Sequence, residues 1–96
     1  MILMKDEIQA NLEDSEGWEL VDETWIKKQF ILRTFPKAIQ FVTDIADLAE
    51  LRQHHPNITI DHKQVTIQLS TLDEGGLTQK DFESAHAYDR TFQKYD

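Results

Sequence analysis

Two adjacent histidines followed by a proline, His54-His55-Pro56, form the densest group of titratable side chains in the sequence. Histidine titrates near neutrality and can both donate and accept a proton. A second segment, from Ser70-Thr71 to Thr78, supplies hydroxyl groups and carboxylates. Two imidazoles flanked by such groups suit general acid–base catalysis on a neutral substrate.

Other roles for the two histidines compete with catalysis. Adjacent residues of an extended chain point to opposite sides, so His54 and His55 are poor ligands for one metal ion, and no third ligand is evident. No serine lies in a nucleophile-elbow motif, which argues against a serine hydrolase. The His-His-Pro run could also simply end a helix, because histidines often bond the last carbonyl groups there. Acid–base catalysis and a helix end therefore both remain open from the residues alone.

Composition limits the class of protein. A chain of 96 residues predicts one domain, residues 1–96, with a small core, and small cores favour oligomers. The absence of cysteine excludes disulfides and thiolate metal sites. A net charge of −8 disfavours nucleic acid as a partner. The apolar run at the N-terminus is too short for a signal peptide or a membrane span, so a cytoplasmic protein without membrane contact is expected.

The strongest helix signal covers about residues 36–53 and leads directly into the histidines. Pro36 suits the first turn of a helix. The apolar residues of this segment cover about half of the helix circumference. They are Ala38, Ile39, Phe41, Val42, Ile45, Ala46, Leu48 and Ala49. So wide a face indicates either deep burial or a second partner on the flank, such as another subunit.

The remaining elements complete an α+β pattern. A short helix is predicted at 5–12 and a last helix from a capping box, Thr78 to Asp81, to about residue 94. Alternating apolar residues predict two hairpins, with strands at 18–21, 26–33, 58–60 and 65–69. The order α-β-β-α-β-β-α predicts a four-stranded antiparallel sheet with helices packed on one face.

The second hairpin places the two chemical segments near each other. If its turn centres on residues 62–63, paired residue numbers add up to about 125, and directly opposed residues lie about 5 Å apart. Residue 54 then lies opposite about 71, and residue 55 opposite about 70. The spacing alone therefore predicts that Ser70, Thr71 and Leu72 lie beside the histidines.

The sequence resembles the pterin-4a-carbinolamine dehydratases, also known as dimerisation cofactors of a homeodomain transcription factor. The resemblance covers nearly the whole chain. Its motifs are Gly17-Trp18, Phe30-x-Leu32-x-x-Phe35, Ala38-Ile39-x-Phe41, Ala49-Glu50-x-x-x-His54-His55-Pro56-Asn57, Val65-x-Ile67-x-Leu69-Ser70-Thr71 and Gly76-Leu77-Thr78-x-x-Asp81. The Glu-x-x-x-His-His-Pro core at this distance from Ser-Thr is the most specific of them.

The resemblance implies a reaction and an assembly. The family removes water from 4a-hydroxy-tetrahydrobiopterin to give the quinonoid dihydropterin, without metal or organic cofactor. Its members are homodimers or homotetramers, joined through the sheet edge and the helix at 36–53. Catalysis by His54 and His55 is implied.

The resemblance also implies a pterin-binding set around the two histidines. Ser70 and Thr71 would hold the pterin edge, and the other members would complete its surroundings. Those others are Glu50, Pro56, Leu72 and Asp81.

Two positions depart from the family pattern. Leu72 stands where the family usually has a third histidine, and His62 stands where it usually has an aromatic residue. Leucine cannot transfer a proton, and the loss of one acid–base group costs about 10²–10⁴ in rate. An impaired family member that binds pterin or another protein is therefore the alternative to a working dehydratase.

Overall fold

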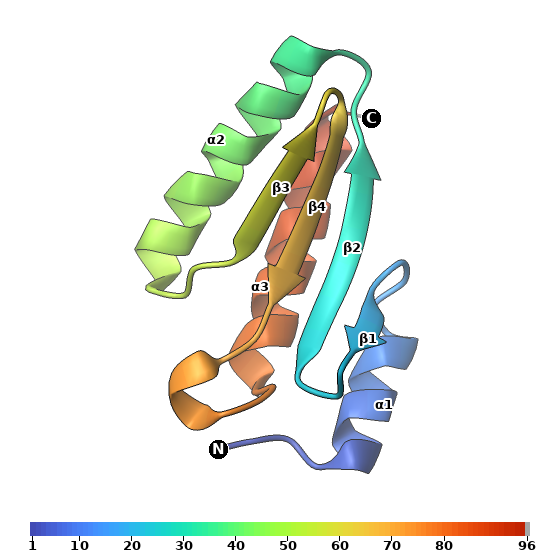
Figure 1. Ribbon diagram of the computed structural model, residues 1–96, viewed down its shortest axis with the longest axis vertical. Coiled ribbons are helices and arrows are strands. Elements are labelled where there is room, and N and C mark those ends of the chain that lie inside the picture. The colour runs from blue at the N-terminus through green and yellow to red at the C-terminus, as the bar shows by residue number, and fades with distance from the viewer. Residues whose placement is uncertain (96) are drawn as a thin grey trace.

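The computed structural model describes residues 1–95 and contains helices on one side of a four-stranded sheet (Figure 1). The helices are α1 (Lys5–Glu13), α2 (Phe35–Arg52) and α3 (Gln79–Phe92), with two short 3-10 turns, η1 (Leu72–Glu74) and η2 (Gln93–Tyr95). The strands are β1 (Glu19–Val21), β2 (Trp25–Ile31), β3 (Asn57–Asp61) and β4 (Gln64–Leu69). The predicted fold class and element order are confirmed.

The sheet has the strand order β1-β2-β4-β3, and all of its pairs are antiparallel. In the β3–β4 hairpin, residue numbers in each pair add up to 125, from Asn57 opposite Gln68 to Asp61 opposite Gln64. The predicted register is therefore confirmed. The ladder ends at Asn57, so the histidines lie just beyond it, in the loop between α2 and β3.

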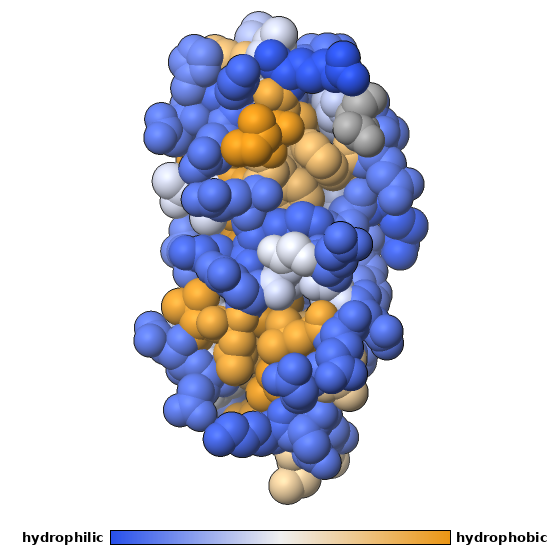
Figure 2. Space-filling model, turned by 90° about the vertical axis from the view of Figure 1, so that its right-hand side faces the viewer, coloured by the Kyte–Doolittle hydropathy of each residue, from blue (hydrophilic) through white to orange (hydrophobic). Residues whose placement is uncertain are grey.

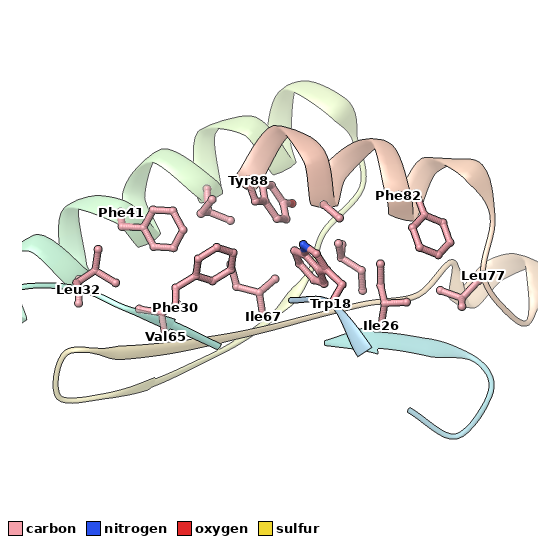
Figure 3. Close-up of a cluster of buried hydrophobic side chains, with 14 of the residues drawn as sticks. Trp18, Ile26, Phe30, Leu32, Phe41, Val65, Ile67, Leu77, Phe82 and Tyr88 are labelled. Carbon is pink, nitrogen blue, oxygen red and sulfur yellow. The ribbon is translucent and has the colours of Figure 1, made fainter. Parts of the chain in front are cut away.

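The core lies between the sheet and the helices, as Figure 3 shows. Alternate residues of β2 and β4 face the helices because successive side chains of a strand point to opposite faces. Phe30 on β2 packs against Phe41 on α2 with a ring-centroid separation of 5.1 Å. Phe82 and Tyr88 bring α3 into the same cluster. This core fixes α2 and α3 side by side, and the candidate site lies between two of their ends.

Both ends of α2 have recognisable sequence causes. The Thr34 hydroxyl accepts a hydrogen bond from the Lys37 backbone N–H at 3.2 Å, and Pro36 occupies the first turn. At the other end Gln53 adopts a left-handed backbone, φ 54°, and terminates the helix. Non-glycine residues rarely take this conformation, so the turn before His54 requires contacts that hold it.

The boundaries differ from the predicted ones by at most two residues. The strand predicted at 26–33 runs from Trp25 to Ile31, because Leu32 leaves the ladder while its side chain stays buried. The last helix ends at Phe92 and continues as the 3-10 turn η2. In residues 1–95, no helix combines the length and the hydropathy needed to cross a membrane.

The side of the molecule with β1 and α1 is mostly polar. Figure 2 shows two apolar patches on this side, separated by a band of hydrophilic residues. Exposed Leu20 on β1 and exposed Met4 before α1 are among the apolar residues of this region. Other exposed apolar residues, Phe35 and Ile39, lie on α2.

Candidate functional site

A contact between His54 and Asp81 is the centre of the candidate site. His54 Nε2 lies 2.6 Å from Asp81 Oδ1 and joins the loop after α2 to the first turn of α3. The His54 side chain is 10% exposed and the Asp81 side chain is fully buried. An ionised carboxylate only accepts hydrogen bonds, so Nε2 is the nitrogen that donates to it, and in the neutral imidazole Nδ1 keeps its lone pair. A carboxylate that fixes a histidine tautomer in this way prepares the ring to act as a general base.

Asp81 also holds the segment that precedes α3. Its Oδ2 atom accepts the Thr71 hydroxyl at 2.8 Å and the Thr78 backbone N–H at 2.9 Å. The Thr71 and Thr78 hydroxyls lie 2.7 Å apart. Asp81 is therefore both the helix cap that the sequence predicts and the direct partner of His54. Each of its oxygens has a hydrogen-bond donor, which stabilises a buried carboxylate.

His55 turns away from His54 toward its own helix. Its Nε2 atom lies 2.5 Å from Glu50 Oε2, on the last turn of α2. This pair is solvated, since the His55 side chain is 59% exposed. Each histidine thus has one carboxylate partner, and the two rings leave the loop in different directions, as expected for adjacent residues.

The other predicted site residues occupy different surroundings. Ser70 is buried, and its hydroxyl donates to the Thr24 backbone carbonyl at 2.6 Å, in the turn between β1 and β2. Leu72 begins η1 and is 72% exposed. Pro56 is half-buried beside the histidines. The predicted proximity of residues 54 and 71 is real, but Asp81 lies between them and connects the two.

Two cavities lie beside α1, away from the histidines. A shallow depression of about 590 Å³ is lined by exposed residues in and beside α1, including Lys5, Gln9 and Glu13. A smaller cavity of about 250 Å³ lies between α1 and β1. Neither of these two cavities is lined by a predicted site residue. Residues 1–95 contain no cluster of three or more histidine, aspartate or glutamate side chains placed to hold a metal ion.

The chain is similar to known proteins over nearly its whole length. The family model described as pterin 4 alpha carbinolamine dehydratase matches residues 1–91. The chain belongs to the pterin-4-alpha-carbinolamine dehydratase family. A relative from Herpetosiphon aurantiacus, named as a candidate enzyme of this type, is 50% identical over 91 residues, 95% of this chain and 94% of that one. A relative from Picosynechococcus with the same name is 43% identical and covers 92% of this chain and 95% of its own length.

Two solved structures share the fold of this family member. One is a transcriptional coactivator/pterin dehydratase from Brucella melitensis, with a TM-score of 0.90, 28% identity and coverage of 95% of this chain and 98% of that one. The other is a pterin dehydratase-like RuBisCO assembly factor of the alpha-carboxysome, with a TM-score of 0.67, 22% identity and coverage of 79% and 89%. At this identity the second shows the fold alone.

Sequence reasoning missed two polar residues next to the pair formed by His54 and Asp81, which is the dyad of this site. Arg52, on the last turn of α2, donates from Nε to the buried Ser84 hydroxyl at 3.1 Å. Ser84 lies three residues after Asp81, on the same face of α3. The sequence did contain a signal for this contact. Ser84 and the hydroxyl of Tyr88 are polar groups on a face of the last helix that otherwise packs on the core.

Proposed function

We propose that the chain dehydrates 4a-hydroxy-tetrahydrobiopterin to the quinonoid dihydropterin, with His54 and His55 as the acid–base pair. The reaction breaks the bond between carbon 4a and its hydroxyl group. The hydroxyl takes up one proton and leaves as water, while a ring nitrogen loses one proton and its electron pair forms a C=N double bond. No redox step is involved, so two proton-transfer groups supply the required chemistry.

The His54–Asp81 pair is the observation that carries this proposal. We assign the base to His54, because Asp81 fixes its tautomer and stabilises the imidazolium that forms when Nδ1 accepts the nitrogen proton. We assign the acid to His55, whose protonated form is paired with Glu50 at a solvated position where the proton is readily replaced. Glu50, Pro56, Ser70 and Leu72 would surround the pterin, whereas the Thr71 hydroxyl supports Asp81.

A second candidate function rests on Leu72. This residue is exposed at the position where the family resemblance expects a third histidine, and it brings no proton donor or acceptor to the site. The alternative is an impaired dehydratase that binds a pterin or a protein. The pair of His54 and Asp81 favours the enzyme, because helix capping accounts for Asp81 but not for the imidazole that it orients.

Stopped-flow dehydration of a synthetic 4a-hydroxy-tetrahydropterin tests both candidates. We expect the wild type to exceed the buffer rate, and His54→Ala and His55→Ala each to lose about 10²–10⁴ in rate. His62→Ala is the matched control, since it removes an imidazole at the tip of the β3–β4 hairpin and should change nothing. The variant Leu72→His separates the two candidates. If it accelerates the reaction and the wild type does not, the chain is an impaired dehydratase. If neither the wild type nor Leu72→His accelerates the reaction, the dehydratase proposal is refuted.

We also propose a homodimer or homotetramer formed through the edge of β3 and through α2. β3 is an edge strand of the sheet, with one side unpaired in this chain. On α2, Phe35 and Ile39 are exposed and Val42 is half-buried, with the helical spacing of a single stripe beside the buried face. Such a stripe is typical of a helix that packs on a partner. A diffusible pterin substrate fits the cytoplasmic location that the sequence predicts.

A further inference from the structure

Three buried polar side chains form a column along the face of α3 that meets the end of α2. They are Asp81, Ser84 and Tyr88, three and four residues apart, and each is fully buried. Residues at this spacing lie above one another on one helix face. A helix normally presents apolar residues on its buried face, so a polar column there needs partners.

The end of α2 supplies partners for two of the three, Asp81 and Ser84, one on each side of its terminal turn. Arg52 donates from Nε to Ser84 Oγ at 3.1 Å and from an Nη atom to Glu83 at 3.2 Å. Two residues later His54 bonds Asp81. Between them stands Gln53, whose left-handed backbone reverses the chain. The turn is therefore hydrogen-bonded to α3 both before and after Gln53, its strained residue.

Tyr88 shows that the charges of the column lie close together. Burial raises the pKa of Tyr88 to about 12, with Arg52 acting to lower it and Asp81 to raise it. Within residues 1–95 the Tyr88 hydroxyl has no hydrogen-bond partner. The phenol is thus neutral, and Arg52 is the positive charge that reaches into the column.

We propose that Arg52 and Ser84 are positioning residues for His54, a role that rests on the proposed dehydratase function. Backbone N–H groups of Gln53 and His54 already hold the last carbonyl groups of α2, so the terminal turn keeps its shape. Without a side-chain contact to α3, however, the whole turn could shift and carry the His54 backbone with it. The Arg52–Ser84 contact keeps the terminal turn against α3 and so holds the His54 ring at its distance from Asp81. A displacement of about 1 Å at a reacting group can cost about 10²-fold in rate.

The charged and titratable groups that face this contact come from two elements. The end of α2 and its following loop contribute Arg52 and His54, and α3 contributes Asp81, Glu83 and Tyr88. The segment before α3 contributes the hydroxyls of its two threonines. The Arg52–Glu83 ion pair is partly exposed and adds little by itself. The bond to the buried Ser84 hydroxyl is the part that fixes the turn.

The test uses Arg52→Gln, Ser84→Ala and the conservative Arg52→Lys, with Arg90→Gln as control. Arg90 is exposed near the other end of α3, so its replacement removes the same charge away from the column. The first readout is hydrogen exchange of the His54 Nε2 proton, followed by NMR, which needs no turnover. The second readout is kcat and KM for dehydration.

We expect Arg52→Gln and Ser84→Ala to speed exchange of that proton and to lower kcat about tenfold, with KM within about twofold. Arg52→Lys should recover part of the loss, since an ammonium group can also donate to Ser84 Oγ. The proposal is overturned if exchange matches the wild type in both variants. If the wild type shows no turnover, dehydration fails, while the exchange data still decide the positioning role. Circular dichroism checks that each variant is folded.

Discussion

Replacing Asp81 by asparagine probes the dyad and the helix cap at once. The carboxylate accepts three hydrogen bonds while fully buried, from His54 at 2.6 Å, Thr71 at 2.8 Å and the Thr78 backbone at 2.9 Å. In an amide of the same shape the oxygen can still accept from Thr71 and Thr78, while the NH2 group faces His54 Nε2. The three hydrogen bonds then lose the negative charge that strengthens them, at about 1 kcal/mol each. We expect the free energy of unfolding to fall by about 2–4 kcal/mol, with the fold retained.

The same change should affect catalysis through the tautomer of His54. An amide NH2 that donates to Nε2 moves the ring proton to Nδ1, which can then no longer accept a proton from the substrate. We expect kcat to fall by about 10²–10⁴. Stopped-flow dehydration gives the rate, urea unfolding gives the stability, and 15N NMR of the imidazole gives the tautomer.

Asp89→Asn is the matched control for Asp81→Asn. Asp89 lies on the same helix, is partly buried and accepts from Trp18 Nε1 at 3.1 Å and Lys28 Nζ at 2.8 Å. Its replacement should cost stability without changing turnover. The role given to the dyad would be wrong if folded Asp81→Asn kept kcat within about threefold of the wild type, because a tautomer switch cannot be so mild.

Two further predictions concern stability and assembly. Burial raises the pKa of Tyr88 and the hydrogen bond to Asp44 raises that of Tyr95, each to about 12. As the pH rises, the unfolded chain therefore loses these protons before the folded chain does, so the free energy of unfolding should fall between about pH 10 and 12. It should fall less steeply in Tyr88→Phe or Tyr95→Phe. If urea unfolding gave the same pH dependence for these variants and the wild type, the expectation would be contradicted. In sedimentation velocity, Ile39→Glu should dissociate the proposed oligomer. Gln40→Glu is the control, since residue 40 lies on a different face of α2, and it should leave the oligomer intact. A wild-type protein that sediments as a monomer would refute the α2 interface.

Local patterns in the sequence predicted most of the fold. The register of the β3–β4 hairpin follows from its short turn and from alternation, because a shift of one residue would bury Thr66 and expose Ile67. The capping box located the start of α3 to within one residue, since a threonine and an aspartate three residues apart satisfy each other locally. Boundaries were less well predicted where burial continues past the ladder, as at Leu32.

The contacts that build the site were beyond such reasoning. His54 and Asp81 are 27 residues apart, and Arg52 and Ser84 are 32 apart. Their meeting depends on the rotation of α2 and α3 about their axes, which the core packing sets and no local pattern records. The left-handed turn at Gln53 was equally hidden, because glutamine has no preference for that conformation.

The two readings of Asp81 from the sequence, as helix cap and as part of the pterin site, turn out to be compatible. One oxygen closes the first turn of α3 and the other holds His54, so a single carboxylate ties the orientation of the imidazole to the formation of the helix. Either role makes the side chain costly to replace, and stability data alone cannot distinguish a catalytic site from an inactive relative. Leu72 does not disturb this arrangement, because its side chain is exposed and the hydrogen bonds of Asp81 are made by other residues. The dyad is therefore built independently of position 72, and restoring a histidine there should add a proton-transfer group without altering the scaffold.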